Sequence, residues 1–423
     1  MTSAILFGVF FLCLFLSIPI AYSLGIASLV TILVTRSIDI SFLTNSIVTS
    51  LDSFPLMAVP FFILAGDIMG KGGISKRLFG FANSLVGSIT GGLAMAAVVT
   101  CMFFAAISGS GPATVAAVGG IMLPIMIGQG YSRDFSAAVV TAAGAIGVII
   151  PPSIPMVMYG VSSGSSVSNL FVAGIVPGIL MGVLMMVWCY VFCKREKYVK
   201  SSEKFSLRAV GKAFWEAKLS LLVPVIVLGG IYGGIFTPTE ASVVSVVYSI
   251  IVSVFVYKEI SFKDLPKIMA NSALTTAIAL IICGTVATFG KIMTMERIPE
   301  MVASAITSFS DSKIVTLLLL NVVLLFAGCF LDTVSAILIL TPILLPVAKA
   351  VSVDPIHFGI IMVVNLAVGF ITPPVGVNLY VGASMAEISI ERLVKAVIPF
   401  FTVMLAALLL TTYLPTLSLM FLK

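Results

Sequence analysis

The chain contains one interrupted segment twice, as Leu123-Pro124 followed by Gly147-x-x-x-Pro151-Pro152 and as Leu345-Pro346 followed by Gly369-x-x-x-Pro373-Pro374. The interval between matched positions is constant, without a gap, and the same frame extends to Gly160 and Gly382. A shared apolar composition would not align prolines and glycines in this way. The sequence therefore consists of two related halves that are broken at matching points, a pattern typical of secondary transporters.

The composition is that of an integral membrane protein. Of the 423 residues, 60% are hydrophobic and 9% are charged, and the mean hydropathy is +1.22. Soluble domains carry about 25% charged residues. Apolar runs such as Val223–Tyr257 and Ile314–Leu331 are long enough to span a bilayer. The first segment, Ile5 to Val34, is too long for a signal-peptide core and lacks a basic start, so we expect it to be retained.

The positive charge gathers at the junction of the halves. Residues 194–218 contain Lys194, Arg195, Lys197, Lys200, Lys204, Arg208, Lys212 and Lys218. By the positive-inside rule this stretch is cytoplasmic, and a lipid-binding or regulatory role is the alternative. The predicted organisation is a first membrane repeat over residues 1–193, a basic linker over 194–218 and a second membrane repeat over 219–423. The net charge of +6 indicates topology and no nucleic-acid partner.

Each half contains two apolar segments that are short for a full crossing. Leu93–Ile107 and Ala113–Gly128 are each about 15 residues long, against the roughly 20 that a crossing needs. They are joined by Ser108-Gly109-Ser110-Gly111-Pro112, and the matching pair is joined near Leu331-Asp332-Thr333. We expect re-entrant helical hairpins over residues 93–128 and 314–350, with tips buried in protein or lining a wet cavity. The alternative is two ordinary spans with a loop.

These segments predict an all-α polytopic membrane protein made of two inverted-topology repeats. Each repeat would have about five crossings and one re-entrant hairpin, which places both termini outside and the linker inside. Pro19 leaves the number of crossings in the first segment open.

The paired prolines predict broken helices. Pro151-Pro152 and Pro373-Pro374 remove two backbone donors each, and the preceding residue is driven out of helical geometry. Carbonyl groups near Gly147, Ile150, Gly369 and Thr372 then lack helical partners and become candidate ligands for a hard cation such as sodium. A simple proline kink is the alternative for either break taken alone.

Hydroxyl and amide side chains gather around the two breaks and the two tips. They are Ser108, Ser110, Thr114 and Ser153 in the first half, and Thr333, Ser335, Thr372 and Asn378 in the second. Helices beginning after the proline pairs would point their positive dipole ends inward, which suits an anionic substrate.

Ionisable residues inside apolar sequence mark candidate functional positions. Asp332 lies at the second tip, where a carboxylate is costly, and could bind sodium, bind a substrate amine or gate the hairpin. A helix N-cap is the structural alternative. Asp67 lies nearer a segment end, so an interfacial position is expected for it. The single histidine, His357, precedes an apolar helix and is expected at the surface.

Two other classes of protein are weaker alternatives. Ser108-Gly-Ser110-Gly superficially resembles the serine motif of an intramembrane protease, but such an enzyme needs a facing histidine and no duplication. An ion channel fits less well than a transporter, because hairpin tips beside carbonyl sites suit occluded binding. The six cysteines indicate neither disulfides nor a metal site.

Several motifs carry a resemblance to one family. They are Asp52-Ser-Phe-Pro-Leu-Met-Ala-Val-Pro-Phe-Phe-Ile-Leu-Ala-Gly66, Lys71-Gly-Gly-Ile-Ser75, Ile107-Ser-Gly-Ser110, Ile149-Ile-Pro-Pro-Ser-Ile-Pro-Met156 and Tyr159-Gly160. Over essentially its whole length the chain resembles the large membrane subunit of tripartite ATP-independent periplasmic (TRAP) transporters. The resemblance implies a sodium-coupled importer of the elevator type in the bacterial inner membrane. Its implied partners are a small membrane subunit and a soluble periplasmic substrate-binding protein, and no enzymatic activity is implied.

The resemblance also implies site residues. The implied sodium ligands are Ser108, Gly109, Ser110, Gly147, Ile150 and Pro151 in the first half, and Asp332, Thr333, Gly369, Thr372 and Pro373 in the second. The implied substrate contacts are Ser110 and Ser153, to which the polar residues above add Thr114, Asn378 and Asp332. Family substrates are mostly carboxylates, and we expect an acidic solute such as sialic acid, a related sugar acid or a C4-dicarboxylate. Sodium ions are the expected coupling ions.

Overall fold

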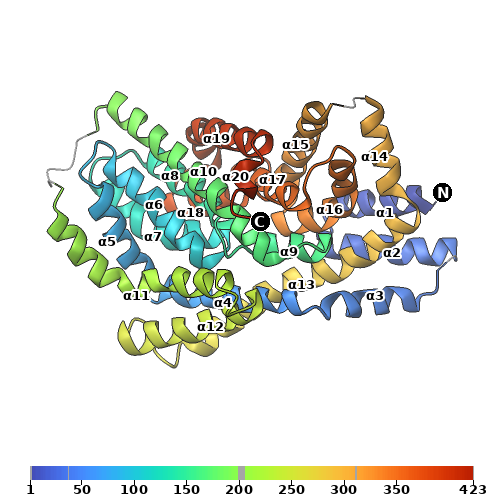
Figure 1. Ribbon diagram of the computed structural model, residues 1–423, viewed down its shortest axis with the longest axis horizontal. Helices are drawn as coiled ribbons and strands as arrows, with labels where there is room; N and C mark the ends of the chain where they lie inside the picture. The colour runs from blue at the N-terminus through green and yellow to red at the C-terminus, as the bar shows by residue number, and fades with distance from the viewer. Residues whose placement is uncertain (1, 37, 199–204, 310–311, 423) are drawn as a thin grey trace.

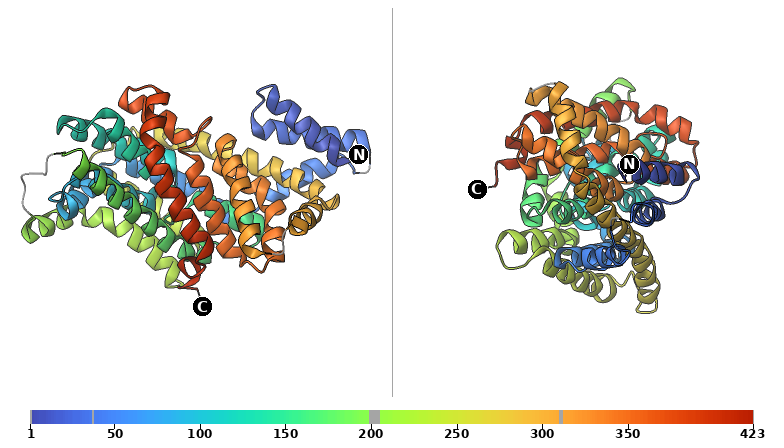
Figure 2. Two further views of the ribbon diagram at one scale, coloured as in Figure 1. Left: turned by 90° about the horizontal axis from the view of Figure 1, so that it is seen from above. Right: turned by 90° about the vertical axis from the view of Figure 1, so that its right-hand side faces the viewer.

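The computed structural model describes residues 2–36, 38–198, 205–309 and 312–422, and within these ranges all regular structure is helical (Figure 1; further views in Figure 2). The first half contains α1 (Thr2–Phe15), α2 (Ile20–Thr35), α3 (Ser41–Leu51), η1 (Phe54–Met57), α4 (Ala58–Lys71), α5 (Ile74–Val86), α6 (Gly92–Ser108), α7 (Gly111–Gly128), α8 (Arg133–Gly144), η2 (Ala145–Val148), α9 (Ile154–Ser163) and α10 (Val167–Arg195). The second half contains α11 (Leu207–Tyr232), α12 (Pro238–Ile250), η3 (Ile251–Val256), α13 (Leu265–Met295), α14 (Ile298–Phe309), α15 (Lys313–Phe330), α16 (Thr333–Ala350), α17 (Pro355–Gly369), α18 (Val377–Ala386), α19 (Ile390–Tyr413) and α20 (Thr416–Leu419).

The helices have the lengths that a bilayer requires. Among the described residues, nine helices or continuous helical segments are long and apolar enough to cross a membrane, and α1, α2, α6 and α17 are shorter apolar helices. The predicted all-α polytopic fold class is confirmed. The inverted orientation of the two halves stays a prediction, as do the domain boundaries. Residues 207–218, which include the basic residues Arg208, Lys212 and Lys218, form the first turns of α11. Part of the predicted linker is therefore helical.

The helix boundaries of the two halves correspond, and capping residues explain why. Ser110 caps α7 and Asp332 caps α16, and each accepts a hydrogen bond from a backbone N–H in the first turn. Ser132 and Asp354 cap α8 and α17 in the same way. Both pairs occupy matched positions of the repeated frame. Because Ser and Asp side chains satisfy N–H groups that a helix start leaves unpaired, local chemistry sets these boundaries in each half.

One element differs between the halves. The second half contains the continuous helix α13, whereas the corresponding part of the first half is divided into α3, η1 and α4. The division falls at Ser53, whose backbone is extended, and at Pro55, which has no N–H donor to continue the hydrogen bonding of α3. The only proline of α13, Pro266, lies in its first turn, where proline is tolerated.

The protein core lies at the helices that precede the two breaks. Residues 135–144 of α8 and 357–369 of α17 are all buried. His357 belongs to this buried set with 1% of its surface exposed, and its Nε2 lies 3.2 Å from the carbonyl oxygen of Thr412. The expected surface position of His357 is therefore wrong. The sequence of an apolar helix such as α17 does not indicate which of its ends packs against neighbouring helices, so the burial of His357 was not predictable.

Candidate substrate cavity

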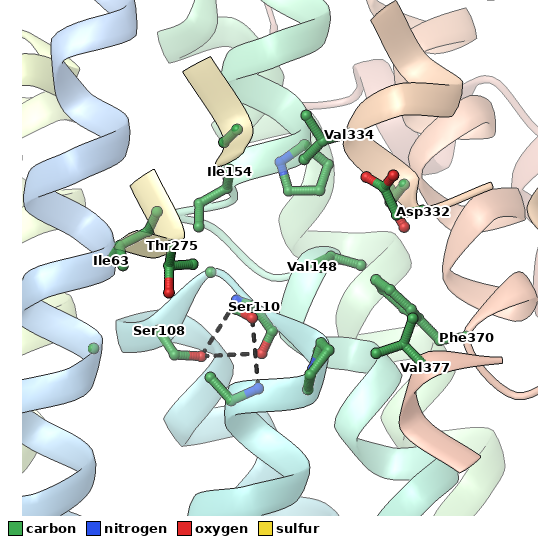
Figure 3. A pocket seen from close by; sticks show the side chains of 18 of the residues that line it. Ile63, Ser108, Ser110, Val148, Ile154, Thr275, Asp332, Val334, Phe370 and Val377 are labelled. Carbon is green, nitrogen blue, oxygen red and sulfur yellow. Dashed lines mark hydrogen bonds between the residues drawn. The ribbon is translucent and has the colours of Figure 1, made fainter. Parts of the chain in front are cut away.

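Both hairpin tips reach one cavity of about 380 Å³ (Figure 3). The first hairpin consists of α6 and α7 and the second of α15 and α16, and their tips contribute Ser108–Ala113 and Asp332–Val334. Figure 3 shows Ser108 and Ser110 on one tip and Asp332 on the other. The volume lies in the range of small-molecule sites.

Much of the cavity wall consists of residues that correspond between the halves. Five lining pairs occupy matched positions of the repeated frame, namely Ser110 with Asp332, Gly111 with Thr333, Pro112 with Val334, Val148 with Phe370 and Pro155 with Val377. The remaining wall comes from Ser108, Gly109 and Ala113 of the first tip, from Ile154 of α9, from Ile63, Gly66 and Asp67 of α4, and from Thr275 and Ala279 of α13. The duplication therefore builds a cavity with a repeated wall, and α4 and α13 add residues from outside the two hairpins.

Hydrogen bonds fold the first tip into a compact turn. Gly109 has φ = +62°, a left-handed conformation that glycine adopts without strain, and it ends α6. The hydroxyl of Thr114 donates to the carbonyl oxygen of Ser110 at 2.7 Å and lies 3.0 Å from the hydroxyl of Ser108. Ser110 is half-buried and its side chain caps α7. The tip thus holds three hydroxyl groups and several carbonyl groups in a small space.

Glycines let neighbouring backbone approach the first tip. A Cβ atom on Gly147 would lie 2.5 Å from Oγ1 of Thr114 and 2.6 Å from the carbonyl oxygen of Ser110. A Cβ atom on Gly66 of α4 would lie 3.2 Å from the Cα atom of Ser108. Position 147 therefore needs glycine for the observed packing, and a methyl group at Gly66 would require Ser108 to shift by a few tenths of an ångström. The short helix η2, which contains Gly147, and the helix α4, which contains Gly66, both pack against the first tip.

The second tip is closed by Asp332. Its carboxylate accepts a 3.0 Å hydrogen bond from the backbone N–H of Ser335 and another bond from the hydroxyl of the same residue. The N-cap alternative for Asp332 is thus observed, yet the half-buried side chain also lines the cavity. Gly369 packs on this hairpin, since a Cβ atom there would lie 2.5 Å from the carbonyl oxygen of Gly328.

The two proline breaks leave backbone carbonyl groups without partners. Among the described residues, the carbonyl oxygens of Ile150 and Thr372 accept no hydrogen bond. The first break is buried from Ile150 to Ser153, whereas Pro373, Pro374 and Val375 are exposed. The Pro151–Pro152 and Pro373–Pro374 peptide bonds are both cis. The breaks thus leave the carbonyl oxygens of Ile150 and Thr372 free, in environments that differ between the halves, and their role as cation ligands stays a prediction.

The charged lining of the cavity is negative. Asp67 and Asp332 are its only charged side chains among the described residues, and Asp67 accepts a hydrogen bond from Ser272 of α13. Asp67 lines the cavity, whereas the sequence had indicated only an interfacial position for it. An aspartate within the apolar segment Phe54–Lys71 was the available signal. Thr275 was also missed, and nothing in its apolar surroundings distinguished it.

The predicted sodium ligands divide into two groups. Ser108, Gly109, Ser110, Asp332 and Thr333 line the cavity. Gly147, Ile150, Pro151, Gly369, Thr372 and Pro373 lie behind the lining at the breaks, one residue or a few from Val148 and Phe370. As ligands and contacts, both groups stay predictions.

Three predicted substrate contacts are engaged elsewhere in this structure. Ser153 is fully buried, and its hydroxyl donates to the carbonyl oxygen of Val148 at 2.6 Å while it caps α9. Thr114 is fully buried within the first tip. Asn378 is fully buried and donates to the carbonyl oxygen of Thr141 at 3.2 Å. None of the three lines the cavity, because hairpin and break pack them against backbone, so the geometry does not favour them as direct contacts.

Two solved transporters share the fold. The YdaH transporter of Alcanivorax borkumensis superimposes with a TM-score of 0.63 at 15% identity, covering 88% of this chain and 87% of that one. MtrF of Neisseria gonorrhoeae gives a TM-score of 0.60 at 13% identity, covering 87% of this chain and 83% of that one. At these identities the likeness concerns the fold, which is that of polytopic membrane transporters.

Sequence comparisons place the chain in a family. Residues 7–417 match the model of the tripartite ATP-independent periplasmic transporter, DctM component. The C4-dicarboxylate TRAP transporter large permease protein DctM of Rhodobacter capsulatus is 41% identical, covering 99% of this chain and 98% of that protein. The sialic acid TRAP transporter large permease protein SiaM of Vibrio cholerae is 38% identical over 96% of this chain and 95% of its own length. The chain therefore belongs to the large permease family of TRAP transporters.

A longer relative is also similar. The isethionate TRAP transporter permease protein DctMQ of Oleidesulfovibrio alaskensis is 50% identical over 99% of this chain. This chain spans 66% of that relative's length.

Proposed function

We propose that this TRAP large permease drives sodium-coupled import of a small organic anion across the bacterial inner membrane. The observation that carries the proposal is the cavity between the hairpin tips, which contains two carboxylates and no basic side chain among its described lining residues. An anion and two carboxylates repel one another in a low-dielectric site. Bound cations remove that repulsion, and this couples cation binding to solute binding.

The residues present fit sodium as the cation. Hard cations take oxygen ligands from carboxylates, hydroxyl groups and backbone carbonyl groups. In the first half, the tip supplies hydroxyl groups and the break supplies the free carbonyl group of Ile150. In the second half, the tip supplies Asp332 and Thr333, and the break supplies the free carbonyl group of Thr372. Sodium would screen the carboxylates and leave the hydroxyl groups of the tips to orient the solute.

The named relatives guide the choice of solute. Proteins similar to this chain carry the names of isethionate, C4-dicarboxylate and sialic acid transporters. All three solutes are organic anions. The isethionate relative has 50% identity, so a small sulfonate or dicarboxylate is favoured here over sialic acid, which stays the alternative.

The partners follow from the family. We propose that the chain works with a small membrane subunit and a periplasmic binding protein that delivers the solute. The isethionate permease DctMQ is longer than this chain, and the additional length fits a fused small subunit. An elevator-like movement of the hairpins against α4 and α13 is consistent with a cavity that both groups of helices line.

The test is uptake into proteoliposomes that contain the chain and its small subunit, with the binding protein outside. Isethionate, succinate and sialic acid are supplied as radiolabelled solutes with a sodium or a potassium gradient. We expect saturable uptake of one of these anions that requires the sodium gradient. Equal uptake with potassium would exclude sodium coupling, and flux that does not saturate would favour a channel.

A further inference from the structure

A second hollow of about 570 Å³ lies beside the hairpin cavity. Most of its wall comes from one side of α13, where the lining residues are Cys283, Val286, Ala287, Gly290, Lys291, Thr294 and Met295. The rest comes from Leu338 and Pro342 of α16, Val161 and Ser162 of α9, and Ser50 of α3. Three of these helices also line the hairpin cavity. The two spaces therefore lie along the same interface between α9, α13 and α16.

The shared interface is visible in the helical spacing. On α13, Thr275 and Ala279 line the hairpin cavity, and Cys283, Ala287 and Lys291 continue the same series of i, i+4 positions into the second hollow. On α16 the series is Val334, then Leu338 and Pro342. Positions four apart are neighbours on a helix surface, and a row of them turns about 40° per step, so the row leads around α13 from one space to the other. With about 1.5 Å per residue, Lys291 lies about 18 Å along α13 from Ala279.

Among the described residues that line the second hollow, Lys291 has the only charged side chain. Its Nζ atom lies 3.3 Å from the hydroxyl of Ser46 and 5.9 Å from the centre of the Phe42 ring. Within the described part of the chain it forms no salt bridge, whereas Arg77, Arg133 and Arg392 each pair with a carboxylate. Lys291 is an exposed cation in the last turns of α13 and has no acidic partner among the described residues, so its charge is available to an anion that enters the hollow.

The charges of the two spaces are opposite. The hairpin cavity contains Asp67 and Asp332, and the second hollow contains Lys291 with the hydroxyl groups of Ser50, Ser162 and Thr294. The hydroxyl groups of Ser50 and Thr294 donate to carbonyl oxygens of their own helices, so the ammonium group of Lys291 is the group that suits a carboxylate or a sulfonate. In the predicted topology, the end of α13 that contains Lys291 faces the outside, where a binding protein would release its solute.

We propose that the second hollow is a waypoint for the transported anion, in which Lys291 holds the carboxylate or sulfonate group before the solute reaches the hairpin cavity. This inference rests on the proposed function. The hollow attracts an anion without cations, and the hairpin cavity accepts it only with them. Lys291 therefore acts on solute capture and has no part in the sodium dependence.

The first arm of the test measures the local potential without transport. Ser50→Cys in a Cys283→Ser background places one thiol in the hollow, because the native Cys283 also lines it, and the rate of modification is compared for anionic and cationic methanethiosulfonate reagents. We expect Lys291→Gln to lower the ratio of anionic to cationic rates roughly fivefold or more, because a unit charge acts on the two reagents in opposite directions. Isethionate or succinate should protect the thiol when Lys291 is present and fail to protect it in Lys291→Gln.

The second arm measures uptake in the assembled transporter. Lys291→Gln should raise the half-saturating concentration of loaded binding protein about tenfold and change the maximal rate less than twofold, since it removes a charge-assisted hydrogen bond. Lys291→Arg should retain the wild-type value. Lys267→Gln, on an exposed part of α13 outside both spaces, is the matched control and should have no effect.

The arms separate the possible failures. An unchanged ratio of rates, or unchanged protection by solute, in Lys291→Gln overturns the waypoint and leaves Lys291 as an anchor at the membrane surface. An effect confined to vesicles with phosphatidylglycerol assigns the hollow to a lipid phosphate and also overturns it. Wild-type protein that transports none of the anions contradicts the proposed function, while the thiol arm still decides the waypoint.

Discussion

The hydroxyl of Ser272, on α13, donates a 2.5 Å hydrogen bond to a carboxylate oxygen of Asp67, on α4. The two residues are 205 positions apart in the sequence, and their bond joins one helix of each half beside the hairpin cavity. Asp67 lines the same cavity as Ser108 and Ser110 of the first tip. This arrangement adds a second carboxylate to a cavity in which the sequence had indicated only Asp332.

Asp67→Asn should weaken the sodium dependence of uptake. The substitution removes one of the two negative charges of the cavity, so the concentration of sodium that gives half-maximal uptake should rise several-fold. Ser272→Ala keeps the charge and should have a smaller effect. Sodium titrations of uptake in proteoliposomes measure both, and an identical sodium dependence in wild type and Asp67→Asn would remove Asp67 from the site.

Asp332→Ala and Ser110→Ala should each abolish sodium-dependent uptake while the protein still assembles. Asp332 also caps α16, so Asp332→Asn is the sharper variant, because asparagine caps a helix about as well as aspartate does. We expect Asp332→Asn to keep normal thermal stability and to lose at least tenfold in uptake rate. Near-normal uptake by Asp332→Asn and Ser110→Ala would contradict the site assignment.

Gly147→Ala should destabilise the protein through the first tip. The added methyl group would lie 2.5 Å from Oγ1 of Thr114, and overpacking of this kind costs about 1–3 kcal/mol. Gly80→Ala is the matched control, since a Cβ atom there meets nothing within 4 Å in the helix α5. Thermal unfolding in detergent should show a lower transition temperature for Gly147→Ala alone, and equal transitions would refute the close packing.

Asn365→Ala should loosen the second hairpin from the core. The side-chain amide of Asn365 on α17 donates to the backbone and side-chain oxygens of Asn321 on α15, at 3.0 and 2.8 Å. Asn321 in turn donates to Thr412 of α19 at 3.1 Å. Loss of such interhelical hydrogen bonds costs about 1 kcal/mol in membrane proteins. Thr402→Ala, an exposed hydroxyl on α19, serves as the control in the same unfolding experiment.

Labelling should establish which side the linker faces. Ser206→Cys at the start of α11 should react with a membrane-impermeant maleimide only after the cells are opened, and Ile40→Cys between α2 and α3 should react in intact spheroplasts. The background is expected to be low because five of the six native cysteines are buried. Reaction of Ser206→Cys from the periplasmic side would reverse the predicted topology.

The sequence determined the local structure of this protein with good accuracy. Glycine, proline and capping residues act on their own backbone, so the hairpin tips at Ser108–Gly111 and Asp332–Thr333 and the breaks after Gly147 and Gly369 were predictable from residue type and spacing. The repeated frame also indicated that both tips would share one site.

Only the tertiary structure decided which faces of the helices meet. It turned Asp67 and Thr275 to the cavity, buried His357, engaged Ser153 with the backbone and placed Lys291 in the second hollow. In a membrane protein the surfaces that face lipid and the surfaces that face other helices are both apolar, so hydrophobic periodicity does not distinguish them. Contacts between residues far apart in the sequence then depend on the packing of the complete chain.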